Sequence, residues 1–219
     1  MKGLKVTLKQ LRAAIRTRAS LYEGFLKLYR YEFDVEKHAG GINRIPWEVM
    51  ERGNAVAVLG HDPDRDEVVL GNEFRPGLIV AGDYPYQDNL VAGGIEDNET
   101  ALEAAVREMK EETGLLLSNP VLIHRGAYVS SGGTSEKISI VYGTVDTRHA
   151  GGVHGNVAEH EDILTVVLPA KVFIDRVRSG DITDLKTLLA GYWFAEAAAG
   201  RAVTTGSSYN SPSARPGEA

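Results

Sequence analysis

The amino-acid sequence predicts an α+β fold, in which a mixed β-sheet is sandwiched between helices. Short runs of aliphatic and β-branched residues recur along the chain and are separated by turns rich in Gly, Pro and Asp. One segment with helical periodicity, residues 101–113, interrupts these runs, and two more follow at 170–178 and 185–199. Strands interrupted by one helix and closed by C-terminal helices are typical of this class.

The N-terminal region, residues 1–48, is expected to hold one helix followed by strands. Residues 7–19 are predicted as the helix, because Leu8, Leu11 and Ile15 recur near helical spacing with basic residues between them. The aromatic-rich stretch 22–36 alternates in part, which indicates strands, and the glycines at 39–43 indicate a turn.

Residues 49–200 are expected to form the main domain. Strands are predicted at 54–60 and 67–71, joined by the polar loop 61–66, and further β-rich runs lie at 78–81, 121–123, 138–145 and 163–168. The stretch 203–219 is rich in Ser, Pro and Gly and is expected to be a disordered tail.

Composition narrows the class of protein. The chain has 219 residues, no cysteine and a net charge of −6, so thiolate chemistry is excluded and nonspecific nucleic-acid binding is disfavoured. No apolar run approaches the roughly 18 residues of a membrane span, and the first residues lack the apolar core of a signal peptide. We therefore expect a cytoplasmic protein with no membrane or nucleic-acid partner. A phosphorylated substrate is compatible with the acidic charge, because bound cations reverse the local sign of a site.

The segment 101–113 carries the strongest signal. Thr100 and Glu103 form a capping-box pattern that starts a helix, and Gly114 is placed to end it. Glu108 and Glu112 lie one turn apart beside the apolar stripe of this helix. Like charges at this spacing destabilise a helix by roughly 0.2–0.5 kcal/mol, so their position beside a buried face favours a cleft over a solvated surface. Oxygen-only ligands of this kind suit Mg²⁺.

The spacing around this helix resembles the signature of the Nudix hydrolases. Gly93 is followed after five positions by Glu99 and after seven more by the nine residues Arg107-Glu108-Met109-Lys110-Glu111-Glu112-Thr113-Gly114-Leu115, with no specified position missing. The resemblance implies a Nudix fold and hydrolysis of a nucleoside diphosphate linked to another group. In the family, Arg107 and Glu99 are scaffold residues.

Sequences outside this signature resemble the bacterial ADP-ribose pyrophosphatases. They are 22–25, 51–53, 73–75, 131–136, 153–155 and 159–163, within a similarity that runs from about residue 21 to 195. This resemblance implies Mg²⁺-dependent hydrolysis of ADP-ribose to AMP and ribose 5-phosphate by a homodimer with exchanged N-terminal strands. Two alternatives stay open: a GDP-mannose or other nucleotide-sugar pyrophosphatase, and a regulator that binds ADP-ribose without cleaving it.

The resemblance also assigns metal ligands. Glu108, Glu112, Glu161 and the carbonyl of Ala92 would bind magnesium, and Glu111 would contribute to a second ion. Two or three ions are expected, and Mn²⁺ is an alternative to Mg²⁺.

Catalytic and substrate-binding residues follow from the same resemblance. Glu159 would be the base that deprotonates the attacking water, with Glu136 as an auxiliary acid. Arg75 would hold the diphosphate and Phe25 would stack on the adenine. Trp47 stands where bacterial relatives often carry an arginine, and it is expected to stack on the adenine as well. On an extended loop the alternation of side chains would point residues 159 and 161 to one side.

Overall fold

The computed structural model describes residues 10–201, which divide into two compact units. One unit contains residues 10–53 together with 130–136, and the other contains 54–129 and 137–201.

The N-terminal unit is a three-stranded antiparallel sheet of β1 (Ala13–Glu23), β2 (Lys27–Glu36) and β3 (Ile42–Glu51), in that order. The loop 130–136 attaches to the end of β3, where the N–H of Met50 donates to Gly133 O over 2.9 Å. Tyr31 and Phe33 stack on β2 with ring centroids 5.6 Å apart. This unit is therefore held by strand pairing and a small aromatic cluster.

The predicted helix at 7–19 is wrong over the described residues, because β1 begins at Ala13; residues 7–9 lie outside the described part of the chain. All eleven residues of β1 are exposed, so a helix here would not be stabilised by burial of an apolar stripe. The strand is stabilised instead by its pairing with β2 and by cross-strand ion pairs. One of these joins Arg16 to Asp34 over 2.9 Å. The strands expected within 22–36 are confirmed; the turn expected at 39–43 is found at 38–41, and β3 already begins at Ile42.

The C-terminal unit contains an eight-stranded mixed sheet. Its strands are β4 (Ala55–Asp62), β5 (Glu67–Phe74), β6 (Tyr86–Asn89), β7 (Val91–Gly94), β8 (Ser118–Tyr128), β9 (Lys137–Thr144), β10 (Val153–His154) and β11 (Ile163–Pro169). The path runs β10-β11-β5-β4-β9-β8, with β6 paired to β5 and β7 paired to β4. Only β4 and β9 pair in parallel within this described sheet.

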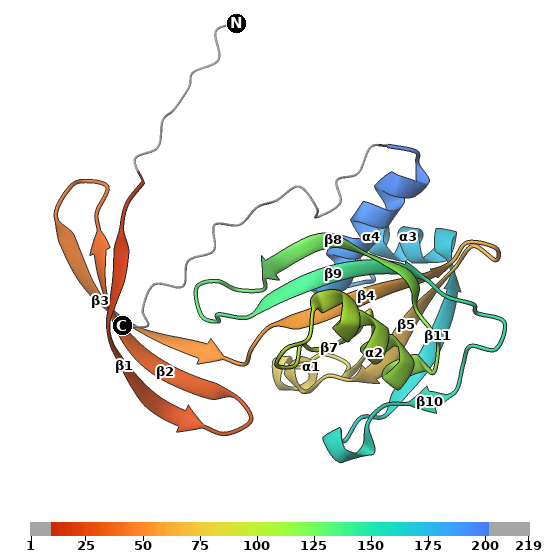
Figure 1. Cartoon of the computed structure of the whole chain (residues 1–219), viewed down its shortest axis with the longest axis horizontal. Coiled ribbons are helices and arrows are strands. Elements are labelled where there is room, and N and C mark those ends of the chain that lie inside the picture. Colours follow the sequence, from red (N-terminus) through yellow and green to blue (C-terminus); the bar gives the residue numbers. More distant parts are fainter. Residues whose placement is uncertain (1–9, 202–219) are drawn as a thin grey trace, which may run out of the picture. The chain divides into compact units, whose positions relative to one another are not determined.

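Helices cover both faces of this sheet. They are α2 (Ala101–Thr113) on one face, and α3 (Ala170–Ser179) with α4 (Leu185–Ala198) on the other (Figure 1). Strand alternation explains the two cores: Val56 and Val58 of β4 pack with Met109 of α2, whereas Ala57 and Leu59 join the cluster of α3 and α4. The predicted sandwich of a mixed sheet between helices is confirmed.

The predicted β-run at 78–81 is wrong, since these residues end the short helix α1 (Pro76–Ala81). Pro76 starts the helix with its fixed φ, and Gly82 ends it in the left-handed region at φ 89°. Val80 is 88% exposed, so burial does not favour a strand. The remaining predicted helices agree with the structure within two residues. Among residues 10–201, no helix is both long and apolar enough to cross a membrane.

Candidate active site

Helix α2 places its carboxylates through defined ends. The capping box predicted at Thr100 is present: its hydroxyl accepts from the N–H of Glu103, whose side chain accepts from Thr100 in return. Gly114 ends the helix at φ 71° and donates to Lys110 O over 2.9 Å. Both ends therefore fix the register, and with it the face on which Glu108 and Glu112 are buried.

Arg107 connects the helix to the loop before it. Its guanidinium donates to both carboxylate oxygens of Glu99, each over 2.9 Å, and to the carbonyl of Gly94. It also donates to Glu108 over 2.7 Å and to Glu111 over 3.1 Å. Arg107 thus neutralises the carboxylates of Glu108 and Glu111 and holds the glycine loop against the helix. The carboxylates around it raise the pKa of the Arg107 guanidinium.

Gly93 is required by the approach of Glu108. A Cβ added at residue 93 would lie 1.9 Å from Oε1 of Glu108, so any other residue would displace this carboxylate. The next residue back, Ala92, donates its N–H to Oε2 of Glu112 over 3.3 Å. Gly93 therefore lets strand β7 pass directly beside the two buried carboxylates.

Glu112 is the most perturbed acid of the helix. Only 2% of it is exposed, and burial, together with the carboxylates of Glu73, Glu108 and Glu161, raises its pKa to about 9. Burial also raises the pKa values of Glu73 and Glu108. Three carboxylates, from strand β5, helix α2 and the loop before β11, thus repel the carboxylate of Glu112.

Glu73 is the member of this cluster that the sequence analysis missed. It follows Gly71 by two positions on β5 and so shares its face, where a Cβ at residue 71 would lie 4.0 Å from Oε2 of Glu112. It lies in the stretch 73–75 that resembles the ADP-ribose pyrophosphatases, but that resemblance assigned a role to Arg75 alone. Arg75, the predicted diphosphate contact, is partly buried and forms an ion pair with Glu73.

The loop 155–161 carries Glu159 and Glu161. It is not extended as expected: Val157–Glu159 form a 3₁₀ turn, and His160 follows in the left-handed region at φ 60°. Gly155 attaches the loop to α2 by donating to Glu111 O over 3.2 Å. Asn156 contacts both predicted residues, through its backbone N–H to Glu161 and its side-chain amide to Glu159, each over 2.8 Å.

Three predicted site residues belong to the N-terminal unit. Phe25 lies in the turn between β1 and β2 and is 92% exposed. Trp47 lies on β3 and donates its indole N–H to Gly132 O over 2.5 Å. Glu136 is buried beside Arg52, with Oε1 3.4 Å from the guanidinium Nε. The roles assigned to these three residues stay predictions.

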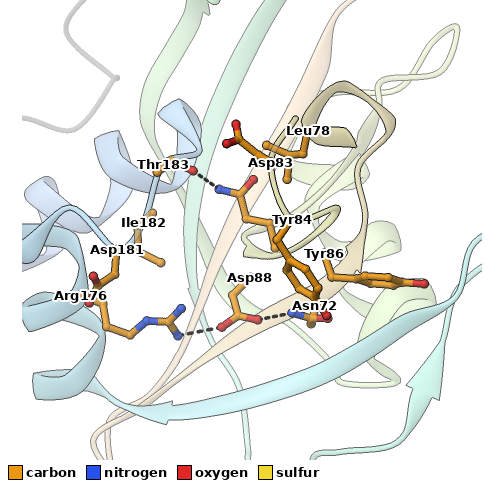
Figure 2. A pocket seen from close by; sticks show the side chains of 11 residues that line it. Asn72, Leu78, Asp83, Tyr84, Tyr86, Asp88, Arg176, Asp181, Ile182 and Thr183 are labelled. Atoms are coloured by element: carbon orange, nitrogen blue, oxygen red, sulfur yellow. Dashed lines mark hydrogen bonds and ion pairs between the residues drawn. The ribbon is translucent and has the colours of Figure 1, made fainter. Parts of the chain in front are cut away.

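A cavity of about 470 Å³ lies elsewhere in the C-terminal unit. The residues that line it include members of α3 and of the α3–α4 loop. Asn72 also lines it, and since neighbouring residues of a strand point to opposite faces, the cavity lies on the face of β5 opposite to Glu73. Asp88 lies between Asn72 and Arg176 (Figure 2), with hydrogen bonds of 2.6 and 2.7 Å to them. Gln87 donates its side-chain amide to the hydroxyl of Thr183. These internal pairs join strand β6 to α3 and to the α3–α4 loop, so the polar groups of this cavity are already engaged within the fold.

The chemistry of the cluster fits a divalent cation. Buried carboxylates that raise one another's pKa are stabilised as anions by an ion of opposite charge, and an all-oxygen donor set suits Mg²⁺ or Mn²⁺. Within residues 10–201, no three acidic or histidine side chains converge tightly enough to form a preassembled metal cluster. Any ion would therefore draw these side chains closer together.

Comparison with known proteins establishes the family. Residues 51–181 match the NUDIX domain, and the chain belongs to this family. It is similar to the ADP-ribose pyrophosphatase of Escherichia coli (strain K12), with 36% identity over 194 residues, 87% of this chain and 91% of the relative. The ADP-ribose pyrophosphatase of Haemophilus influenzae is also 36% identical, over 66% of this chain and 68% of that protein.

More distant relatives carry a different name. The GDP-mannose pyrophosphatase of Pectobacterium atrosepticum is 30% identical over 162 residues, 74% of this chain and 83% of the relative. A solved structure of an ADP compounds hydrolase superposes with a TM-score of 0.67 at 22% identity, covering 88% of this chain and 98% of the other. This last likeness confirms the Nudix fold.

Proposed function

We propose that this protein hydrolyses ADP-ribose to AMP and ribose 5-phosphate with the help of divalent cations. The observation that carries the proposal is the similarity to ADP-ribose pyrophosphatases across 87% of the chain, far beyond the signature itself. The cluster around Glu112 supports the metal dependence, because it concentrates buried negative charge where a phosphate anion alone would be repelled.

Glu108, Glu112, Glu161 and the carbonyl of Ala92 would hold the ions, and Glu111 would contribute to a second one. When bound, Mg²⁺ supplies positive charge to the diphosphate oxygens and acidity to the attacking water. Two or three ions are proposed, and Mn²⁺ also suits these ligands.

Glu159 would accept the proton of the attacking water. Its side chain is exposed on the loop and is not among the proposed metal ligands, so its carboxylate can act as a general base. Arg75 would leave its ion pair with Glu73 to bind the diphosphate, since an arginine fork matches phosphate oxygens. Glu136 would act as an auxiliary acid.

The nucleoside would stack on Phe25 and Trp47, whose exposed fractions are 92% and 52%. We propose that these residues act in a homodimer built through the N-terminal strands. The eleven exposed residues of β1, with the large apolar side chains of Ile15, Leu21 and Tyr22 among them, support this.

The test is AMP release measured with Mg²⁺ across ADP-ribose, GDP-mannose, NADH and diadenosine polyphosphates. The proposal expects ADP-ribose to give the highest kcat/KM and EDTA to abolish the reaction. A preference for GDP-mannose would support the second enzyme named by the relatives. Tight ADP-ribose binding without AMP release would support a regulator.

A further inference from the structure

We infer that Asn156 is a positioning residue that holds the base Glu159 in place through its side-chain amide; this inference rests on the proposed function. Asn156 contacts the two acids of its loop by different groups. Its backbone N–H donates to Oε2 of Glu161, and its side-chain Nδ2 donates to Oε1 of Glu159, each over 2.8 Å. A side-chain substitution can therefore release Glu159 and leave the contact to Glu161 in place.

The orientation of the amide follows from its two partners. The N–H of Ala158 can only donate, so the side-chain atom 3.0 Å from it is the carbonyl oxygen Oδ1. The carboxylate of Glu159 can only accept, so it faces Nδ2. Asparagine satisfies both partners at once through its amide, whereas Asp at this position would satisfy Ala158 alone and Ser would lack the amide N–H.

The loop needs such a residue because of its charge and exposure. Glu159, Glu161 and Asp162 place three carboxylates within four positions, and Glu159 itself is exposed. An unrestrained glutamate at the surface samples many rotamers and is repelled by its neighbours. A neutral donor restrains this carboxylate and adds no positive charge that would compete with a divalent cation.

The backbone around Asn156 supports the same arrangement. Its carbonyl accepts from the N–H groups of Glu159 and Glu161, over 2.9 and 3.2 Å, because the left-handed His160 turns the chain back. Gly155, directly before it, attaches to Glu111 of helix α2. Asn156 thus stands where the loop joins the helix of the proposed metal ligands, and its side chain extends from this fixed point to Glu159.

The experiment compares Asn156→Asp and Asn156→Ser with the wild-type protein. Both residues keep the cap on Ala158, since Asp, Ser and Asn are equivalent there, and both lack the amide donor. We expect kcat for AMP release to fall about 10- to 100-fold in both, the usual effect of losing an orienting partner. KM for ADP-ribose and the affinity for Mn²⁺, titrated by electron paramagnetic resonance, should change less than about threefold, because the Glu161 contact uses the backbone.

The matched control is Val157→Ala, which truncates a neighbouring side chain that is 86% exposed and should leave kcat unchanged. Wild-type kcat in both variants would overturn the inference, and a loss in Asn156→Asp alone would also overturn it by showing that added charge is the cause. A parallel loss of Mn²⁺ affinity and melting temperature would assign Asn156 a structural role instead. Absence of AMP release by the wild-type protein would instead refute the proposed function.

Discussion

Replacing Glu112 by glutamine should stabilise the metal-free protein, and the gain should grow with pH. Glu112 is buried among Glu73, Glu108 and Glu161, which raises its pKa to about 9 from 4.5 in the unfolded chain. Between these two values the folded protein keeps a proton that the unfolded chain has released. Raising the pH through this window therefore favours unfolding. Glutamine has the shape of the protonated acid and has no such proton to lose.

The size of the effect follows from proton linkage. One proton retained by the folded state changes the free energy of unfolding by about 1.4 kcal/mol per pH unit. Between pH 6 and pH 8, wild type should lose roughly 2–3 kcal/mol more than the Glu112→Gln variant. For a chain of this size, that difference corresponds to about 4–12 °C in melting temperature.

The assay is urea unfolding followed by circular dichroism, in EDTA, at pH 6 and pH 8. The matched control is Glu111→Gln, which removes the same charge one position away, where the side chain is half exposed and paired with Arg107. Its stability should change by no more than about 1 kcal/mol, with no extra dependence on pH. An equal pH dependence in wild type and Glu112→Gln would refute the reasoning, and added Mg²⁺ should restore wild-type stability at pH 8 but leave the variant nearly unchanged.

Three further predictions test other parts of the protein. Glu159→Gln should lower kcat by roughly 10²- to 10⁴-fold with little change in metal affinity, whereas Glu161→Gln should weaken Mg²⁺ binding. Calorimetric Mg²⁺ titrations and kcat values measured on both variants distinguish the two roles. Near-normal turnover in Glu159→Gln would show that another acid is the base. Phe25→Ala or Trp47→Ala should raise KM for ADP-ribose roughly 5- to 150-fold if each ring stacks on the adenine, and an unchanged KM in both would show that the rings are structural. Thr100→Ala should cost about 1 kcal/mol of stability by removing the cap of helix α2, as read from urea midpoints, and Thr100→Ser should recover most of it.

The sequence predicted the centre of the C-terminal unit well because its signals are local. A capping box, a terminating glycine and an apolar stripe fix helix α2 without reference to the rest of the chain. The same is true of α4, where Asp184 caps the first turn by accepting from the N–H of Thr187. Gly93 was also predictable as a position of close approach, although the partner it admits, Glu108, is visible only in three dimensions.

The errors arose where long-range contacts or end effects decide the local structure. Strand β1 exists through its pairing with β2, which no periodicity within residues 13–23 reports. Helix α1 has a β-prone composition, and Pro76 and Gly82 override it at the two ends. Glu73 escaped notice because its effect on the pKa of Glu112 depends on β5 lying beside helix α2, which only the folded structure shows. Asn156 escaped because its two side-chain hydrogen bonds depend on a tight turn that composition alone does not predict.

The acids of helix α2 differ in what compensates their charge, and this difference orders their expected roles. Glu108 and Glu111 each accept a hydrogen bond from the guanidinium of Arg107. Glu112 accepts its hydrogen bond from a backbone N–H, that of Ala92, and faces other carboxylates. A divalent cation therefore gains most from contact with Glu112, where it relieves the largest electrostatic penalty. Loss of this side chain should weaken metal binding more than loss of Glu111, even though the two acids are adjacent in the signature.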